Sequence, residues 1–517
     1  MVRRAMRFAG LTGALASLLV LMSTATAWAD STGSNLTAPD ELDKVGIGLN
    51  LLWIIVGAVL VIFMQAGFAL VETGFCRAKH AAHVVSTNFA IFGLGFVAFF
   101  LVGYAFMFGG FSYPGVFGYD EAVGEALIGS GHWVFLWKGG FALSGKAYDV
   151  AVMAMFLYMV AFMDTTATIP TGAMAERWKW KSFVVWGLFC GALYYPLFGA
   201  WTWGGGWLSQ LGNSLDLGWG YVDFAGSGIV HMMGGVAALM GAIVLGPRIG
   251  KYGPDGRPRH LAAHHIPMAM LGCFILLFGW FGFNAASTFA ATDVRFTVVA
   301  ANTAIAAAFG ATIAMFWVML RTGKPDPGMM VNGMLAGLVA ITAPCAFVQP
   351  WAAAVIGSIA AVIVIEAFWV IERKFKIDDP VGAIAVHGVG GLLGVLSVGI
   401  FSDGAYGTGW NLTENDYVGD AGITGILYDF EVGIRQLAAQ AIGAATIVVV
   451  MGTIVFLFFK IQNALTKGGI RSEQADEIAG LDLPEMGVYA YPEFEHVIHD
   501  AEGEAMAASP PSPDHRL

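Results

Sequence analysis

Long stretches without a charged residue recur along the chain and are separated by short polar segments. Residues 51–70 form one such stretch, and about 20 residues of helix cross a hydrocarbon core of about 30 Å. The pattern predicts an all-α polytopic membrane protein. Its eleven predicted transmembrane helices cover residues 47–71, 86–109, 149–172, 182–202, 224–247, 263–288, 297–320, 328–348, 351–371, 380–401 and 433–459.

The N-terminal residues follow a different pattern. Arginines near the start precede the apolar residues 11–22, and residues 27–29 (Ala-Trp-Ala) have the small-x-small form of a cleavage site. These features predict a secretory signal peptide over residues 1–29, with an uncleaved first span as the alternative. An external segment (30–46), the eleven-helix domain (47–460) and a cytoplasmic acidic tail (461–517), partly disordered at its end, are expected to follow.

The distribution of Lys and Arg residues predicts the orientation. Most of those between the predicted spans fall in segments on the same side as the C-terminus, such as the segment with Arg177, Lys179 and Lys181. Positive charges are concentrated in cytoplasmic loops. We therefore expect an external N-terminus, a cytoplasmic C-terminus and a multi-pass location in the cell membrane.

Composition excludes several classes of function. The chain is 57% hydrophobic and 12% charged, whereas soluble domains carry about 25% charged residues. Its net charge of −11 argues against a nucleic-acid partner. No nucleotide-binding or hydrolase motif is found, so we predict no enzyme, cofactor or metal site. The cysteines are far apart and are expected to be small buried hydrophobes: Cys76, Cys190, Cys273 and Cys345.

One motif occurs twice. The stretches "DFAGSGIVHMMGG" and "DPVGAIAVHGVGG" both read D-x2-G-x3-V-H-x2-G-G and fall on the fifth and tenth predicted spans. Because five spans per unit is an odd number, the second unit crosses the membrane in the opposite sense. The sequence thus predicts a five-plus-five inverted repeat (spans 1–5 and 6–10) around a central pore. The matched polar residues are Asp223 with Asp379 and His231 with His387.

The paired histidines are the strongest functional signal. Each is predicted about eight residues into its helix, or about 12 Å from the start, so both reach the middle of the membrane. Flanking glycines allow the two helices to approach, and the histidines are expected to meet. Ionisable groups inside a membrane are expensive and usually functional, although a structural hydrogen bond is the alternative. Asp223 and Asp379 are expected to cap their helices.

Aromatic residues are expected to border the same path. Phe162 lies on the third span near Tyr158, Trp203 near the end of the fourth, and Trp280 and Phe283 with Ser287 on the sixth. A desolvated cation gains about 0.5–2 kcal/mol over an aromatic face. An interfacial aromatic belt is the alternative interpretation of such residues at span ends.

Together these residues resemble the Amt/Mep/Rh family of ammonium transporters. The supporting motifs, in order, are "MAER", "WGGG", "DFAG" with His231, "GWFGFNA", "DDP" with His387, and "GLD" in the tail. The resemblance covers residues 45–490. It implies nitrogen uptake by a homotrimer with one pore per subunit in the lipid bilayer, and a PII-type signal protein as cytoplasmic partner.

The resemblance also implies roles for individual residues. Trp203, Phe162, Ser287 and Asp223 resemble the external ammonium-recruitment site, and Phe162 and Phe283 the aromatic gate. Trp280 resembles a pore-lining aromatic, and His231 and His387 the twin histidines of a hydrophobic pore. The implied mechanism is capture of ammonium, loss of a proton, passage of ammonia and reprotonation inside.

Three features depart from the family pattern. The loop between Trp203 and Asp223 is long, so the external vestibule is expected to differ. Asp164, close to the gate candidate Phe162, is expected to face a neighbouring helix. Glu485 stands where several members have a histidine.

Other functions stay open at this stage. Paired intramembrane histidines also ligate haem in membrane redox proteins. A low-transport ammonium sensor and an Rh-type channel for neutral gas are further alternatives.

Overall fold

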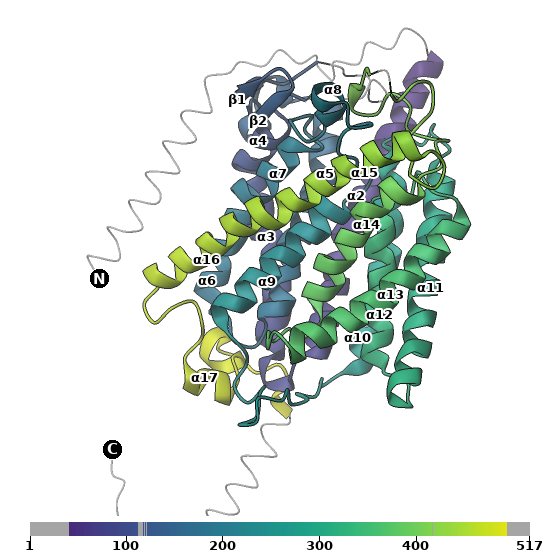
Figure 1. The fold of residues 1–517 in the computed structure, drawn as a ribbon. Coiled ribbons are helices and arrows are strands. Elements are labelled where there is room, and N and C mark those ends of the chain that lie inside the picture. Colours follow the sequence, from purple (N-terminus) through teal and green to yellow (C-terminus); the bar gives the residue numbers. More distant parts are fainter. Residues whose placement is uncertain (1–40, 112–116, 118, 120, 416, 494–517) are drawn as a thin grey trace, which may run out of the picture.

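The computed structural model describes residues 41–111, 117, 119, 121–415 and 417–493. The predicted signal peptide (1–29), most of the external segment and the end of the tail lie outside these residues. The described part is a bundle of long helices with a small β-hairpin at one end and the tail at the other (Figure 1).

The helices follow the predicted spans closely. Ten helical stretches in the described residues are long and apolar enough to cross a membrane, and α12 is shorter. It ends at Thr342, two residues before Pro344. The α-helices are α2 Glu41–Phe75, α3 Ala81–Ala98, α4 Tyr104–Phe108, α5 Val150–Met174, α6 Trp180–Phe189, α7 Tyr195–Trp201, α8 Leu211–Leu215, α9 Met233–Leu245, α10 Ile266–Trp280, α11 Phe296–Thr322, α12 Pro327–Thr342, α13 Pro350–Arg373, α14 Gly390–Phe401, α15 Phe430–Thr446, α16 Gly452–Leu465 and α17 Gln474–Ala479.

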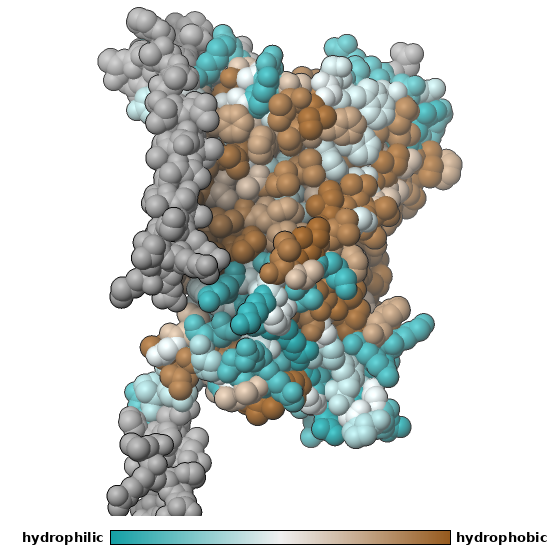
Figure 2. All heavy atoms as spheres, turned by 90° about the vertical axis from the view of Figure 1, so that its left-hand side faces the viewer, coloured by the Kyte–Doolittle hydropathy of each residue, from teal (hydrophilic) through white to brown (hydrophobic). Residues whose placement is uncertain are grey.

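A hydrophobic band surrounds the middle of the bundle. In Figure 2 hydrophobic residues form this band between hydrophilic residues at both ends of the visible face. Exposed Leu, Ile, Val and Phe side chains such as Phe89 and Leu320 belong to the outward helix faces. Such a band is expected where lipid covers the protein. The four cysteines are buried and free, as predicted.

We name the two ends by what they carry. The hairpin end has the antiparallel strands β1 (Glu125–Ser130) and β2 (Trp133–Lys138), together with α8 in the long loop before Asp223. Hydrogen bonds from Asn415 to the Gly212 and Gly218 carbonyls fix that loop. The hairpin was not predicted, because its strands have 6 residues each and are too short to appear in a search for spans.

The tail end carries α17 and the following π-helical turn η13 (Asp482–Met486). The Asp482 carboxylate accepts from the His83 backbone N–H at 2.9 Å, and Glu485 accepts from the N–H of Trp180 at 3.2 Å. Glu477 accepts from the Ile249 backbone N–H at 2.7 Å, and it pairs with Arg471 of the tail itself at 2.8 Å. The first part of the acidic tail is therefore packed on the bundle, which excludes a wholly solvated tail.

Each histidine helix begins later than predicted. The π-helical segments η7 (Ser227–Met232) and η10 (Ile384–Val389) place His231 and His387 only three or four residues after the helix start, instead of eight. Gly226 (φ 113°) and Gly382 (φ 83°) adopt left-handed backbone conformations before the helices begin. The chain turns at these glycines, so the preceding aspartates lie outside the helices.

Close backbone packing joins the two repeat units at the histidines. A side chain at Gly235 would lie 2.2 Å from the backbone nitrogen of Gly388. Only a glycine fits there, since the contact is with backbone that cannot move aside. The glycines of the twin motif thus let η7–α9 and η10–α14 cross and bring the histidines together.

Replacing Gly235 with alanine is expected to prevent this crossing and to destabilise the protein by about 1–3 kcal/mol, the usual cost of overpacking. Gly390→Ala is the matched control, because its nearest contact would be the Val339 side chain at 3.4 Å. Thermal unfolding of both purified variants checks this. Equal midpoints for the two variants would contradict the account.

Candidate functional site

The two histidines of the repeated motif lie in contact at the centre of the bundle. The Nδ1 atoms of His231 and His387 are 3.1 Å apart, and the ring centroids are 5.2 Å apart. This confirms the predicted contact. A hydrogen bond between two neutral rings requires one ring to carry its hydrogen on Nδ1 and the other on Nε2. His231 Nε2 is buried without a hydrogen-bond partner among the described residues.

Aromatic rings cover the hairpin side of this pair. The Trp280 and Phe283 rings stack on His231 with centroids 5.1 Å and 5.4 Å away. The indole N–H of Trp280 donates to the Thr342 hydroxyl at 2.9 Å, so it points away from the histidine pair. His231 therefore presents its free nitrogen to a mainly apolar surrounding.

Two phenylalanines close the path above Trp280. The rings of Phe162 and Phe283 stack with centroids 4.1 Å apart and an interplanar angle of 28°. Both side chains are fully buried. A molecule that reaches His231 from the hairpin end must displace at least one of these rings, which is the geometry of a gate.

Beyond the stacked Phe162 and Phe283 rings, toward the hairpin end, the remaining recruitment candidates converge. The Trp203 ring lies 5.6 Å from Phe162, and its indole N–H donates to the Asp223 backbone carbonyl at 2.7 Å. The Ser287 hydroxyl lies 3.0 Å from the Tyr158 hydroxyl. Tyr158 also contacts Phe162 with centroids 4.7 Å apart. Sequence reasoning placed Tyr158 in the aromatic cluster with Phe162, one helical turn away, but gave it no role in recruitment or in the gate.

Asp223 lies beneath this cluster and caps its own helix. Its carboxylate oxygens accept from the N–H groups of Gly226 (3.0 Å), Gly228 (2.8 Å) and Ile229 (2.9 Å). Burial raises the pKa of Asp223 to about 6, although these N–H groups favour the charged form. Asp379 caps η10 in the same way, through Gly382 and Ile384. The predicted capping role is confirmed for both aspartates.

On the tail side of His387 the path continues into a small cavity of about 20 Å³. The Phe68 ring lies 6.2 Å from the His387 ring, and the cavity is also bordered by Glu72, Asn332 and Val381. Sequence reasoning missed Glu72, because the predicted first span stopped at residue 71. The helical pattern of the sequence continues to Phe75, and this pattern could have indicated that the Glu72 carboxyl lies inside the bundle.

Asp164 lies apart from the path. It is buried close to Cys190 of η6 (Cys190–Tyr194), and its Oδ1 atom has no hydrogen-bond partner in the described part of the chain. Its proximity to Cys190 agrees with the expectation that it faces a neighbouring helix, which stays a prediction.

The geometry of the histidine pair does not suit the two axial ligands of a haem iron, which lie on opposite sides of the ion. Two metal–nitrogen bonds of about 2 Å on opposite sides of an ion would hold the nitrogens about 4 Å apart, whereas the Nδ1 atoms are 3.1 Å apart. No group of three or more His, Cys, Asp or Glu residues suited to a metal is found among the described residues. The haem-ligand alternative has no support in this arrangement.

Comparisons with known proteins agree with the motifs. The model of the Ammonium Transporter Family matches residues 52–491. The chain is 42% identical to ammonium transporter Amt2 of Archaeoglobus fulgidus, over 93% of this chain and 95% of that protein. It is 36% identical to ammonium transporter Amt1 of Haloferax mediterranei, over 87% of this chain and 80% of that protein.

Solved structures share the fold. A protein described as a "Sensor Amt Protein" is 34% identical with a TM-score of 0.73, over 86% of this chain and all of that one. Mep2 of Candida albicans is 28% identical with a TM-score of 0.68, over 87% of this chain and 92% of that one. Since the family model spans most of the chain and the named relatives cover nearly all of it, this multi-pass membrane protein belongs to the ammonium transporter family.

Proposed function

We propose that this transporter captures ammonium at the hairpin end, removes its proton, and passes ammonia through the lumen that holds the twin histidines. The observation that carries the proposal is the 3.1 Å contact between His231 and His387 directly behind a stacked pair of phenylalanines. This arrangement offers hydrogen bonds to a small neutral molecule but no charge to hold a cation.

Recruitment is assigned to Trp203, Phe162, Ser287 and Asp223. The aromatic faces attract a cation at about 0.5–2 kcal/mol each, and the Ser287 hydroxyl supplies an acceptor beside them. The Asp223 carboxylate is turned toward its own helix, so it acts through its charge and through the carbonyl that holds Trp203.

Proton removal follows from the cost of desolvation. A cation loses far more hydration free energy than a neutral molecule when it enters an apolar lumen. Ammonium avoids this cost by transferring its proton to water at the hairpin end, which gives ammonia and hydronium, whereas potassium has no proton to lose. Phe162 and Phe283 are the proposed gate, and Trp280, His231 and His387 line the pore.

The state of Asp223 makes capture depend on external pH. Because its pKa is raised to about 6, the carboxyl becomes neutral as the pH falls through that value, and its attraction for ammonium is lost. We expect the apparent affinity for ammonium to fall several-fold between about pH 7 and pH 5, where an ordinary aspartate stays charged.

Initial uptake rates of the reconstituted protein over a range of ammonium concentrations measure this. The Asp223→Asn variant is the control: it is expected to show the low affinity at both pH values. An affinity of the unmodified protein that is the same at both pH values would contradict the role of Asp223.

We also propose the surroundings that the resemblance implies. The protein is a homotrimer in the cell membrane with one pore per subunit, and residues 1–29 are a cleaved signal peptide. The hairpin end faces outside and the tail end faces the cytoplasm, because the Lys and Arg residues between spans are concentrated at the latter. The docked tail, in which Glu477 accepts from the Ile249 N–H and Asp482 from the His83 N–H, is part of the surface offered to a PII-type signal protein.

A transport assay separates this proposal from a sensor of low transport. Proteoliposomes that contain a pH-sensitive dye receive an inward ammonium gradient. We expect the internal pH to change much faster than in protein-free liposomes. The same rate in both preparations would favour the sensor.

A further inference from the structure

A buried carboxyl group lies beside the pore on the tail side of the histidines. Glu72 belongs to α2 and is 3% exposed. It lies one helical turn from Phe68, on the same face of the helix, and Phe68 contacts His387. Glu72 and His387 border the same cavity of about 20 Å³. A water molecule needs about 10–15 Å³, so this cavity has room for about one molecule of that size.

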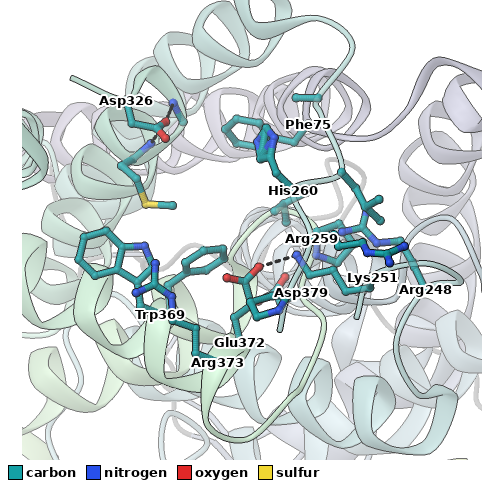
Figure 3. A pocket seen from close by; sticks show the side chains of 18 of the residues that line it. Phe75, Arg248, Lys251, Arg259, His260, Asp326, Trp369, Glu372, Arg373 and Asp379 are labelled. Atoms are coloured by element: carbon teal, nitrogen blue, oxygen red, sulfur yellow. Dashed lines mark hydrogen bonds and ion pairs between the residues drawn. The ribbon is translucent and has the colours of Figure 1, made fainter. Parts of the chain in front are cut away.

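The cavity leads toward the tail end. Asn332 and Val381 border it, and both also line a much larger cavity of about 680 Å³ that has several charged side chains in its lining. Figure 3 shows the charged lining of this larger cavity, with Lys251 paired to Glu372 at 2.5 Å and Asp379 nearby. The order of groups from the histidines outward is thus Glu72, then Val381 and Asn332, which border both cavities, then the larger cavity as a vestibule that is open to solvent.

Glu72 has partners that hold it beside the path. The Asn88 amide donates to Oε2 at 2.7 Å. The orientation of the Asn88 amide is fixed by its other partner. Gln65 donates to the Thr168 hydroxyl (3.0 Å), and that hydroxyl donates to Asn88 Oδ1 (3.0 Å). The carboxyl also lies against Gly172, where an added Cβ would be 3.1 Å from Oε1.

Thr171 allows this carboxyl to exist in two protonation states. Its hydroxyl oxygen is 2.7 Å from Glu72 Oε2, 2.9 Å from Oε1 and 2.5 Å from the Thr168 carbonyl. A hydroxyl has one hydrogen to donate. If the Thr171 hydroxyl donates its hydrogen to the Thr168 carbonyl, a hydrogen bond between Thr171 and Glu72 needs a hydrogen from Glu72. Glu72 is then a carboxylic acid that donates to the Thr171 oxygen. If Glu72 is ionised, Thr171 turns its hydrogen toward the carboxylate instead.

We propose that Glu72 returns the proton to ammonia on the tail side of the histidines, and that its carboxylate then forms a second ammonium-binding site. The inference rests on the proposed passage of neutral ammonia. The lone pair of ammonia forms an N–H bond as the O–H bond of the Glu72 acid breaks. Ammonium and carboxylate are left paired in the cavity.

The cycle closes with a proton from the vestibule. Ammonium leaves past Val381 and Asn332, and the carboxylate takes a proton from hydronium in the solvent there, so ammonia and hydronium become ammonium and water. The titratable groups facing Glu72 are His387 across the cavity, Asp379 before η10 and Cys76 directly after α2. None of these three groups is hydrogen-bonded to the Glu72 carboxyl or to the Thr171 hydroxyl.

The test compares two glutamate variants in liposomes with the full chain. Glu72→Gln keeps the size and the Asn88 hydrogen bond but cannot exchange a proton. We expect its ammonium flux to fall by about tenfold or more, since a proton donor typically contributes at least that factor, and its dependence on the pH of the tail-side compartment to disappear. Glu366→Gln is the matched control with unchanged flux, because Glu366 pairs with Arg321 on the outer side of the bundle.

A second measurement does not require the variant to be active. We expect the infrared difference spectrum of the unmodified protein to show a carboxylic-acid C=O band that disappears when ammonium is added. If Glu72→Gln cannot be purified, Glu72→Asp takes its place, and this variant is expected to shift the band. The inference would be overturned if Glu72→Gln had the same flux and the same pH dependence as the unmodified protein. A spectrum without such a band would also overturn it. Failure of the proposed function looks different: the unmodified protein would then give no flux above that of empty liposomes.

Discussion

Ammonium transport is expected to fall by about 10- to 100-fold when His231 and His387 are both replaced by alanine. The 3.1 Å pair offers hydrogen bonds in a part of the lumen where Trp280, Phe283 and Phe68 supply the neighbouring apolar surface. A molecule in this lumen then loses hydrogen bonds worth about 1–3 kcal/mol each, the cost of leaving a buried polar group unpaired. The flux of reconstituted protein, measured by internal pH after an ammonium jump, checks this.

The control for this variant is His132→Ala. His132 is exposed at the hairpin end, where its ring contacts Gln210 at 3.1 Å, and its loss should leave the flux unchanged. Thermal unfolding of each variant shows whether the bundle is intact. A stable double variant with the flux of the unmodified protein would show that the histidine pair has only a structural role.

Replacing Arg248 with methionine is expected to lower the free energy of unfolding by about 3–5 kcal/mol, the usual effect of breaking a buried ion pair. Arg248 lies at the centre of a buried network at the tail end. Its guanidinium contacts Asp378 Oδ2 at 2.8 Å and Glu176 Oε1 at 3.0 Å, and all three side chains are at most 4% exposed. The variant leaves two buried carboxylates without this partner.

The pH dependence of this effect has a definite sign. Burial opposes ionisation of Asp378, but Arg177 and Arg248 hold its pKa well below the usual value. A depressed pKa of this kind contributes stability above about pH 4, the pKa in the unfolded chain, and the contribution is lost as the pH falls further. The difference between Arg248→Met and the unmodified protein should therefore shrink at acid pH.

Thermal unfolding followed by tryptophan fluorescence measures both effects. Arg257→Met is the matched control, because the Arg257 side chain is 87% exposed and lies 3.7 Å from Asp255. An exposed pair of this kind contributes about 0–1 kcal/mol. Equal destabilisation by the two variants would contradict the structural importance of the buried network.

Features that depend on the lipid and on the repeat could be predicted from the sequence. The hydrophobic stretches gave the helices because a membrane selects for long apolar segments. The twin motif gave the contact between His231 and His387, since two copies of one pattern in an inverted repeat meet at its axis. The capping of η7 and η10 by Asp223 and Asp379 followed from residue type and position.

Features that depend on side-chain packing could not be predicted. The late start of the histidine helices depends on the left-handed conformations of Gly226 and Gly382. The hydropathy of a segment carries no information on backbone conformation, so this start could not be predicted. The burial of Glu72 was not predicted, because a charged residue ends a predicted span. In the structure Asn88 and Thr171 hold Glu72 inside the bundle by hydrogen bonds. The partners of Arg248 are far apart in the chain, so no local pattern joins them.

The central claim is that the lumen passes ammonia and excludes a cation that cannot lose its charge. The most direct test is potassium uptake, measured in the same proteoliposomes as ammonium uptake and at equal concentration. Potassium could approach the aromatic cluster at Trp203 but would have to pass His231 and His387 as a desolvated ion. We predict that it enters at least about 100 times more slowly, a difference of about 2.7 kcal/mol in barrier height. Uptake of potassium at a rate similar to that of ammonium would contradict the account.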